Sequence, residues 1–323
     1  MKRSLWLFLQ LVLIAAIFGF LFWSAAAATN ADGKNVFADL REQPKRWHFL
    51  AAAFCIQLFA VSLTFIRWHW LLRTLGLQCS YREAFRLGFL GLMLNLAPLG
   101  IVGGDAVKAV LIAKKNPNAK AQAVASVFID RFIGLLVMFI CGTILLVWTK
   151  FAFRTEMLAQ TLTGIVFACT AASLLGTCIV FLPFFTQGHL ERQIEKIPFC
   201  GKLLGKLTQS MLLYRSHKRC LFQSCLITVF VHLSFGLSLY LAAAALFPQV
   251  PGAVDHIMLH NVANVTSVIP LAAGPYELIL EQLYQLQTAS VGRGLIVALV
   301  YRLITICVAA AGIVFVVRPI LFR

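Results

Sequence analysis

Charged residues are scarce in this sequence. Asp, Glu, Lys and Arg make up 12% of the 323 residues and hydrophobic residues 60%, whereas soluble domains are roughly a quarter charged. This composition excludes an ordinary soluble fold. The formal charge of +16 does not indicate nucleic acid, because most basic residues lie between apolar runs, where they attract anionic lipids and set membrane orientation.

The apolar runs lack the alternation of apolar and polar residues that marks the strands of a membrane β-barrel. They match the ~20 residues that a helix needs to cross hydrocarbon, and we predict an all-α, polytopic membrane protein with about six transmembrane helices. The first run could instead be a signal peptide, because Lys2 and Arg3 precede it. The six expected spans are residues 4–29, 47–66, 121–148, 157–188, 220–250 and 294–317.

Motifs of catalysis and metal binding are missing as well. The sequence has no CxxC pair, GxSxG elbow, phosphate loop or dinucleotide fingerprint, and most of its nine cysteines lie in apolar runs. His256 and His260 have the spacing of a helical metal pair, but no Glu follows His256. We expect no metal, no cofactor and no enzymatic activity.

Basic residues are concentrated in segments 73–120 and 192–219, whereas segment 247–292 contains no Lys or Arg. The positive-inside rule then places both termini in the cytoplasm of a cell-membrane protein. Six crossings fit this orientation if connectors 81–115 and 252–287, which are too apolar for loops, return to the side that they left. We therefore predict two re-entrant helix pairs.

The two connectors share a pattern. Pro98 is followed seven residues later by Asp105, and Pro270 is followed by Glu277 at the same offset. Backbone that breaks at membrane depth persists where protein buries it or where it lines a wet cavity. Each break therefore marks a candidate site.

The correspondence continues into the next span. Arg131 follows the first acid by 26 residues, and Arg302 follows the second by 25. We predict a single membrane domain, 1–323, built as an inverted repeat of 1–149 and 157–317. In transporters of this architecture, half-helices meet near the midplane around one site.

Two explanations of the arginines stay open. A central arginine costs roughly 2.5 to 3.5 kcal/mol on translocon-based scales, and an ion pair would offset this cost. Arg131 could pair with Asp105 or Asp130, and Arg302 with Glu277, which would fasten the re-entrant pairs. The same groups could instead line a polar path in which a guanidinium grips a lipid phosphate.

Gly103 and Gly104 precede Asp105 where we expect a new half-helix to start. A helix N-terminus offers free amides to an anion, although Asp105 could cap the helix itself. Lys108 adds positive charge one turn later.

Three more polar or flexible positions flank the breaks. Asn95 and Asn264 lie upstream of the two prolines, where they could satisfy broken backbone or contact a headgroup, and Gly274 lies just before Glu277. Segment 189–218 is amphipathic and basic. It is expected to lie on the inner leaflet or to serve as a charged connector.

From Trp47 onward the chain resembles the lysylphosphatidylglycerol synthetase transmembrane region, also called the flippase-like integral membrane proteins. The second break departs from the family's glycine-rich run, since it reads Ala-Ala-Gly-Pro-Tyr-Glu from 272 to 277. The residues that carry the resemblance are Arg67, Trp68, Asn95, Pro98, Gly103, Gly104, Asp105, Lys108, Asp130, Arg131, Phe132, Gly134, Pro270, Glu277 and Arg302.

The resemblance implies a protein that moves amphiphilic lipids between leaflets: aminoacylated phosphatidylglycerol, hopanoids or polyprenyl-linked sugars in different relatives. Synthetase members carry a soluble transferase domain, which we do not expect here, because the last expected span ends six residues before the last residue. The expected partners are membrane lipids and a separately encoded lipid-modifying enzyme, with no nucleic acid. A membrane enzyme or accessory subunit of glycolipid, polyprenyl-phosphate or aminoacyl-lipid synthesis, and a scaffold for a glycosyltransferase, are the alternatives.

Overall fold

The computed structural model of the chain describes residues 2–28, 35–96, 100–181, 213–268, 271 and 273–315. Within these ranges the elements are helices, with no β-strand. Five helices are long and apolar enough to cross a membrane, so the predicted polytopic all-α fold is confirmed. They are α3 (Trp47–Thr74), α6 (Lys120–Trp148), α7 (Met157–Phe181), α11 (Lys218–Leu246) and α14 (Arg293–Ala311).

The first expected span is helical too. α1 (Lys2–Ala27) contains the apolar stretch Val12–Ala27, which is shorter than the five long helices. The short helix α2 (Val36–Glu42) follows, and its N-cap Asn35 accepts the Ala38 N–H at 2.9 Å. A membrane crossing by α1 stays a prediction.

Both connectors contain a break between two helices, as predicted. In the first, α4 (Tyr81–Leu96) is followed by α5 (Gly100–Lys115); in the second, α12 (Ala253–Ala263) and a 3₁₀ turn are followed by α13 (Pro275–Thr288). The longest of these helices has 16 residues, or ~24 Å, which is less than the ~30 Å of a hydrocarbon core. Their lengths suit re-entrant helices, and their depth in a bilayer stays a prediction.

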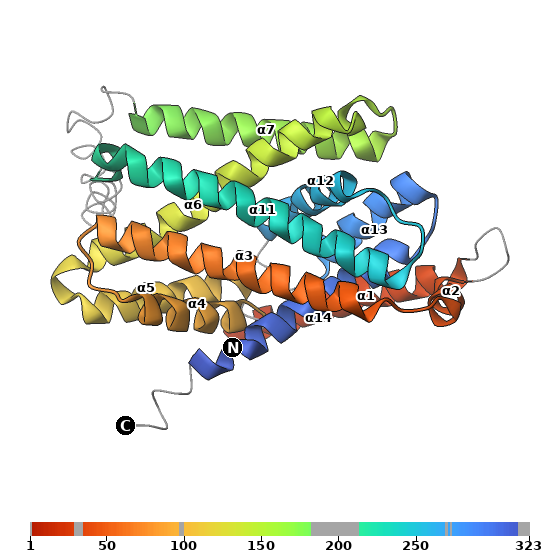
Figure 1. Cartoon of the computed structure of the whole chain (residues 1–323), viewed down its shortest axis with the longest axis horizontal. Helices are drawn as coiled ribbons and strands as arrows, with labels where there is room; N and C mark the ends of the chain where they lie inside the picture. Colours follow the sequence, from red (N-terminus) through yellow and green to blue (C-terminus); the bar gives the residue numbers. More distant parts are fainter. Residues whose placement is uncertain are drawn as a thin grey trace.

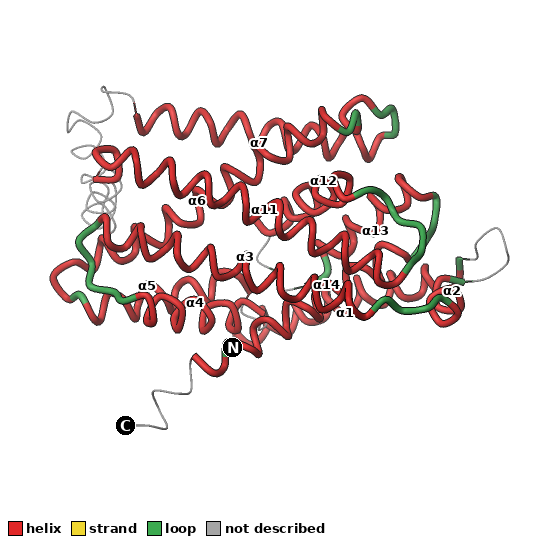
Figure 2. Tube along the Cα trace, in the orientation of Figure 1, coloured by secondary structure: helices red, strands yellow, loops and turns green. Residues whose placement is uncertain are grey.

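Each connector forms a helical hairpin: α4 and α5 make the first hairpin, and α12 and α13 make the second. The two hairpins enter the bundle from opposite ends. The loops from α3 to α4 and from α5 to α6 lie at one end, at the left of Figure 1, together with the beginning of α11. The loops from α6 to α7, from α11 to α12 and from α13 to α14 lie at the other end, and Figure 2 shows most described loops gathered at these ends. This arrangement agrees with an inverted repeat, which stays a prediction.

Close helix contacts join α11 to α3 at the centre of the bundle and to α12 of the second hairpin. α3 and α11 pack side by side through the centre, where Ser238 donates a hydrogen bond to the Ala53 carbonyl at 3.0 Å. A Cβ at Gly236 would lie 2.4 Å from the Ile257 Cα, so glycine is required where α12 crosses α11. The core of this half is formed by apolar side chains of α11, α12, α13 and α14, together with others from α1, α6 and α7.

A buried carboxylate joins α13 to α14. Glu281 is 1% exposed and accepts the N–H groups of Gly292 at 2.5 Å and Leu295 at 2.8 Å. These are amides of the first turn of α14, which have no partner within their own helix. Because Glu277 lies one turn before Glu281 on the same face, this cap also sets where Glu277 meets α14.

Several predicted features lie partly or wholly outside the described residues. They are Pro98, Pro270, most of the amphipathic connector 189–218, and the last residues of the expected spans 4–29, 157–188 and 294–317.

Candidate functional site between the two hairpins

The first predicted acid and arginine form an ion pair. Asp105 on α5 contacts the Arg131 guanidinium on α6 and also holds Lys108 at 2.8 Å. The Asp105 side chain is 13% exposed and that of Arg131 43%. The pair therefore joins α5 to α6, while much of the arginine stays accessible.

Gly104, just before Asp105, serves helix packing rather than a helix start. α5 already begins at Gly100, so the prediction that a new half-helix starts at Asp105 is wrong, as is the alternative that Asp105 caps it. A Cβ at Gly104 would lie 2.2 Å from the Gly91 carbonyl oxygen. Asn95 accepts the Gly104 N–H at 3.1 Å, and the two helices meet through this close contact.

Asp130, the neighbour of Arg131, has a different partner. Arg67 on α3 donates to the Asp130 carboxylate at 2.8 Å and to Thr228 on α11 at 2.7 Å. Sequence analysis used Arg67 for the family resemblance but did not place it in the site. Arg67 directly follows the expected span 47–66 and lies inside the observed helix α3. A charge in an apolar helix is also the signal that singled out Arg131.

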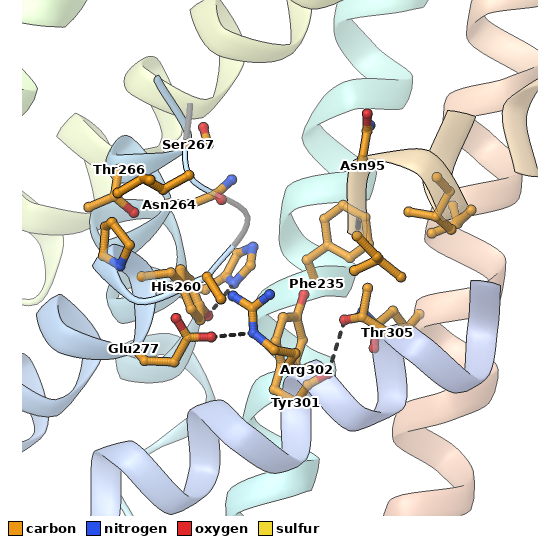
Figure 3. A pocket seen from close by; sticks show the side chains of 18 residues that line it. Asn95, Phe235, His260, Asn264, Thr266, Ser267, Glu277, Tyr301, Arg302 and Thr305 are labelled. Carbon is orange, nitrogen blue, oxygen red and sulfur yellow. Dashed lines mark hydrogen bonds and ion pairs between the residues drawn. The ribbon is translucent and has the colours of Figure 1, made fainter. Parts of the chain in front are cut away.

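The second predicted pair is also formed, as Figure 3 shows. Glu277 on α13 is 0% exposed and contacts the Arg302 guanidinium on α14, whose side chain is 24% exposed. Glu277 also accepts the Gly274 N–H at 2.8 Å. Gly274 has a φ of +106°, which favours glycine, and Pro275 starts α13.

Two adjoining cavities lie between the hairpins. One, of about 270 Å³, is lined among others by Glu277 and Arg302; we call it the neutral cavity. The other, also of about 270 Å³, is lined among others by Lys108, Asp130 and Arg131; we call it the cationic cavity. The residues that line both are Val61, Leu92, Asn95, Phe235, Asn264 and Ser267.

The predicted site residues thus divide into two groups. Asn95, Lys108, Asp130, Arg131, Asn264, Glu277 and Arg302 line one or both cavities. Gly103, Gly104, Asp105 and Gly274 line neither. Of these, Gly104, Asp105 and Gly274 contact the neighbours described above. Asn264 ends α12, and its amide lies 3.3 Å from the Met138 sulfur.

The charges of the two cavities differ. Around the cationic cavity, Arg67, Lys108 and Arg131 face the carboxylates of Asp105 and Asp130, a surplus of one positive charge. In the neutral cavity, Arg302 faces Glu277. A phosphate would therefore be attracted to the first cavity, where planar guanidinium groups can bind it with two hydrogen bonds.

Polar residues that were not predicted to belong to the site also line the neutral cavity. They include Gln57, His260 and Tyr276. His260 accepts or donates a hydrogen bond at 3.0 Å with the Tyr276 hydroxyl, whereas His256 contacts Tyr284. The two histidines therefore bind separate tyrosines, and the described residues contain no cluster of three or more metal-binding side chains.

Comparison with known proteins agrees with the membrane fold. The chain is similar to a UPF0104 membrane protein of Methanocaldococcus jannaschii, at 26% identity over 119 residues, which cover 36% of this chain and 34% of that relative. The chain therefore matches about a third of the relative's length. Residues 7–312 match the family model described as the lysylphosphatidylglycerol synthase TM region. This match covers most of the chain and shows that the protein belongs to that family.

Proposed function

We propose that this protein moves a lipid with an anionic headgroup between the two leaflets of the cell membrane. The observation that carries the proposal is the pair of adjoining cavities between hairpins that enter from opposite ends. Each cavity is lined by at least one arginine that a carboxylate holds: Arg67 and Arg131 in the cationic cavity and Arg302 in the neutral cavity. A headgroup entering from either end would meet a guanidinium, while the acyl chains stay in lipid.

Arg131 is suited to exchange its partner. Its side chain is 43% exposed, and Lys108 lies 2.8 Å from the same Asp105 carboxylate. When Arg131 turns to a phosphate, Asp105 keeps a counter-ion. The exchange therefore avoids an unpaired buried charge, which would cost several kcal/mol.

Arg302 would receive the headgroup in the second cavity. It lies on the part of α14 that faces both Glu277 and the cavity. Asn95 and Asn264 line both cavities and offer hydrogen bonds along the route between the two arginines. The headgroup thus keeps polar partners along the whole path. Lipid tails alone offer no such partners, and a polar group without them is costly to bury.

The distribution of basic residues supports an orientation with both termini in the cytoplasm. The end of the bundle that holds the α3–α4 and α5–α6 loops carries more basic residues than the opposite end. At the opposite end, Arg41, Lys45, Arg46, Lys150, Arg154 and Arg293 are accompanied by the acids Asp39, Glu42 and Glu156. Positive loops stay on the cytoplasmic side. Basic residues at the first end include Arg73, Arg82, Lys114, Lys115, Lys120, Lys218 and Arg219.

The proposal assigns no catalytic step to this chain. The cavity-lining carboxylates Asp130 and Glu277 are engaged by arginines, so neither is poised as a free acid or base. A membrane enzyme would change the mass of its lipid, whereas a translocator changes only its leaflet. Mass spectrometry of lipids before and after incubation therefore separates the two functions.

The direct test is leaflet exchange in liposomes that contain a fluorescent phosphatidylglycerol, with external quenching as the readout. We expect exchange above that of empty liposomes, and loss of about tenfold or more for Arg131→Ala, because a charge-assisted contact contributes about 1.5 to 3 kcal/mol. Arg154→Ala is the matched control. Arg154 is 32% exposed and paired with Glu156, and it lines neither cavity. Equal rates for the two variants, or none above empty liposomes, would refute the proposal.

A further inference from the structure

Two residues that line the neutral cavity, Gln57 and His260, have buried polar atoms without partners among the described residues. Gln57 is 2% exposed, and its amide nitrogen donates to Thr305 at 2.6 Å. Its amide oxygen has no hydrogen-bond partner among the described residues. Turning the amide over would leave the nitrogen unpartnered instead, so one polar atom of this cavity-lining residue has no hydrogen bond in either orientation.

His260 presents a second such atom. The residue is 3% exposed, and its Nδ1 contacts the Tyr276 hydroxyl at 3.0 Å. Its Nε2 has no partner within the described part of the chain. A buried polar atom without a hydrogen bond costs about 1 to 3 kcal/mol. Two such atoms, on residues that line the same cavity, indicate a ligand with several hydrogen-bonding groups.

The other walls of this cavity suit a neutral, hydroxyl-rich ligand. The rings of Tyr276 and Tyr301 are stacked with centroids 6.1 Å apart and offer apolar faces to C–H groups. Thr266 and Asn264 add a hydroxyl and an amide. Because Arg302 and Glu277 neutralise one another, the cavity offers no net charge to an ionic group.

The two cavities are close enough to bind parts of one molecule, since Asn95, Asn264 and Ser267 line both. We propose that they bind one lipid headgroup in two parts. The phosphate binds in the cationic cavity, at Arg131 and Lys108. A neutral polyol attached to it, such as inositol, a sugar or glycerol, binds in the neutral cavity.

This inference rests on the proposed function and names its substrate class: a phospholipid whose phosphate carries a neutral polyol. It also excludes a cationic headgroup such as a lysyl ester. The cationic cavity has surplus positive charge, and the carboxylates there and in the neutral cavity are already paired with cations. An added ammonium would therefore lose its hydration without gaining a counter-ion.

The test measures binding of short-chain lipids to the purified full chain in detergent. The probes are dioctanoyl phosphatidic acid, phosphatidylinositol, phosphatidylglycerol and lysyl-phosphatidylglycerol. We expect phosphatidylinositol to bind roughly fivefold or more tightly than phosphatidic acid, since each net hydrogen bond contributes about 1 kcal/mol. Lysyl-phosphatidylglycerol should bind more weakly than phosphatidylglycerol.

Variants test which cavity binds the polyol and which binds the phosphate. Gln57→Leu should abolish the preference for phosphatidylinositol and leave phosphatidic acid binding unchanged, which also shows that the variant is folded. Arg131→Ala should weaken all phosphate lipids by a similar factor. If Gln57→Leu also loses phosphatidic acid binding, Thr305→Val is judged by the same criterion, because Thr305 contacts Gln57 and lines the same cavity.

Three results would overturn the inference: equal affinity of wild type for phosphatidic acid and phosphatidylinositol, a preference that persists in both cavity variants, or lysyl-phosphatidylglycerol binding at least as tightly as phosphatidylglycerol. Leaflet exchange decides the proposed function separately. Exchange without polyol selectivity refutes the inference alone, and selective binding without exchange refutes translocation.

Discussion

Arg67 and Asp130 form a buried ion pair at 2.8 Å, with side chains 6% and 10% exposed. The same arginine bonds to the Asp130 carbonyl at 3.1 Å and to Thr228, so α3, α6 and α11 meet at one guanidinium. The next residue, Arg131, contacts Asp105 on α5. Asp130 thus joins α6 to α3 through Arg67, which also bonds to α11, and its neighbour Arg131 joins α6 to the first hairpin.

We predict that Asp130→Asn lowers the free energy of unfolding in detergent by about 3 to 5 kcal/mol, because it leaves Arg67 as a buried charge without its counter-ion. Glu156→Gln is the control: it breaks a pair at 3.4 Å between side chains 32% and 45% exposed. Such a pair contributes about 1 kcal/mol or less. Equal losses in denaturant unfolding would mean that the Arg67 pair does not hold the bundle.

Gly104→Ala should loosen the first hairpin. The added Cβ would lie 2.2 Å from the Gly91 carbonyl oxygen and 2.3 Å from the Asn95 side-chain oxygen, so α4 and α5 must separate, at a cost of about 1 to 3 kcal/mol. Gly164→Ala on α7 is the control, since nothing lies within 4 Å of its new Cβ. There alanine should stabilise the helix by up to about 1 kcal/mol. Thermal unfolding of both variants measures the contrast, and a stable Gly104→Ala protein would contradict the close contact.

Cys79, in the loop between α3 and α4, should react slowly with maleimide. Burial raises the pKa of this thiol to about 11, and the nearby Glu83 adds to the shift. The neutral thiol therefore dominates at pH 7 to 9, and the reactive thiolate is roughly 100-fold rarer than for an exposed cysteine near pKa 8.5. Its labelling rate should keep rising with pH up to about 11.

A cysteine at the exposed neighbouring position, Gln78→Cys, is the matched control for Cys79. In single-cysteine proteins, the rate at position 78 should level off at a pH about two units lower. Coinciding pH profiles at the two positions would show that Cys79 is not buried in the folded protein.

Sequence reasoning found both acid and arginine pairs because each leaves a signal along the chain: a charge within an apolar run, at a matched distance from a proline. The predicted helix start at Asp105, after two glycines, is wrong, since glycine marks a close helix contact as readily as a helix end. Sequence reasoning also missed Gln57 and Glu281. Their partners, Thr305 on α14 and the first amides of that helix, are fixed by tertiary packing, which no local spacing encodes.

The central claim is that one headgroup route passes both Arg131 and Arg302. Leaflet exchange of a fluorescent phosphatidylglycerol, measured for wild type, Arg131→Ala, Arg302→Ala and the double variant, tests it most directly. Sites in series predict that each single variant loses about tenfold or more. Because the times of consecutive steps add, the double variant should be at most about twofold slower than the slower single one. Single variants that each keep about half of the wild-type rate, with exchange lost in the double variant alone, would indicate two independent routes and contradict the account.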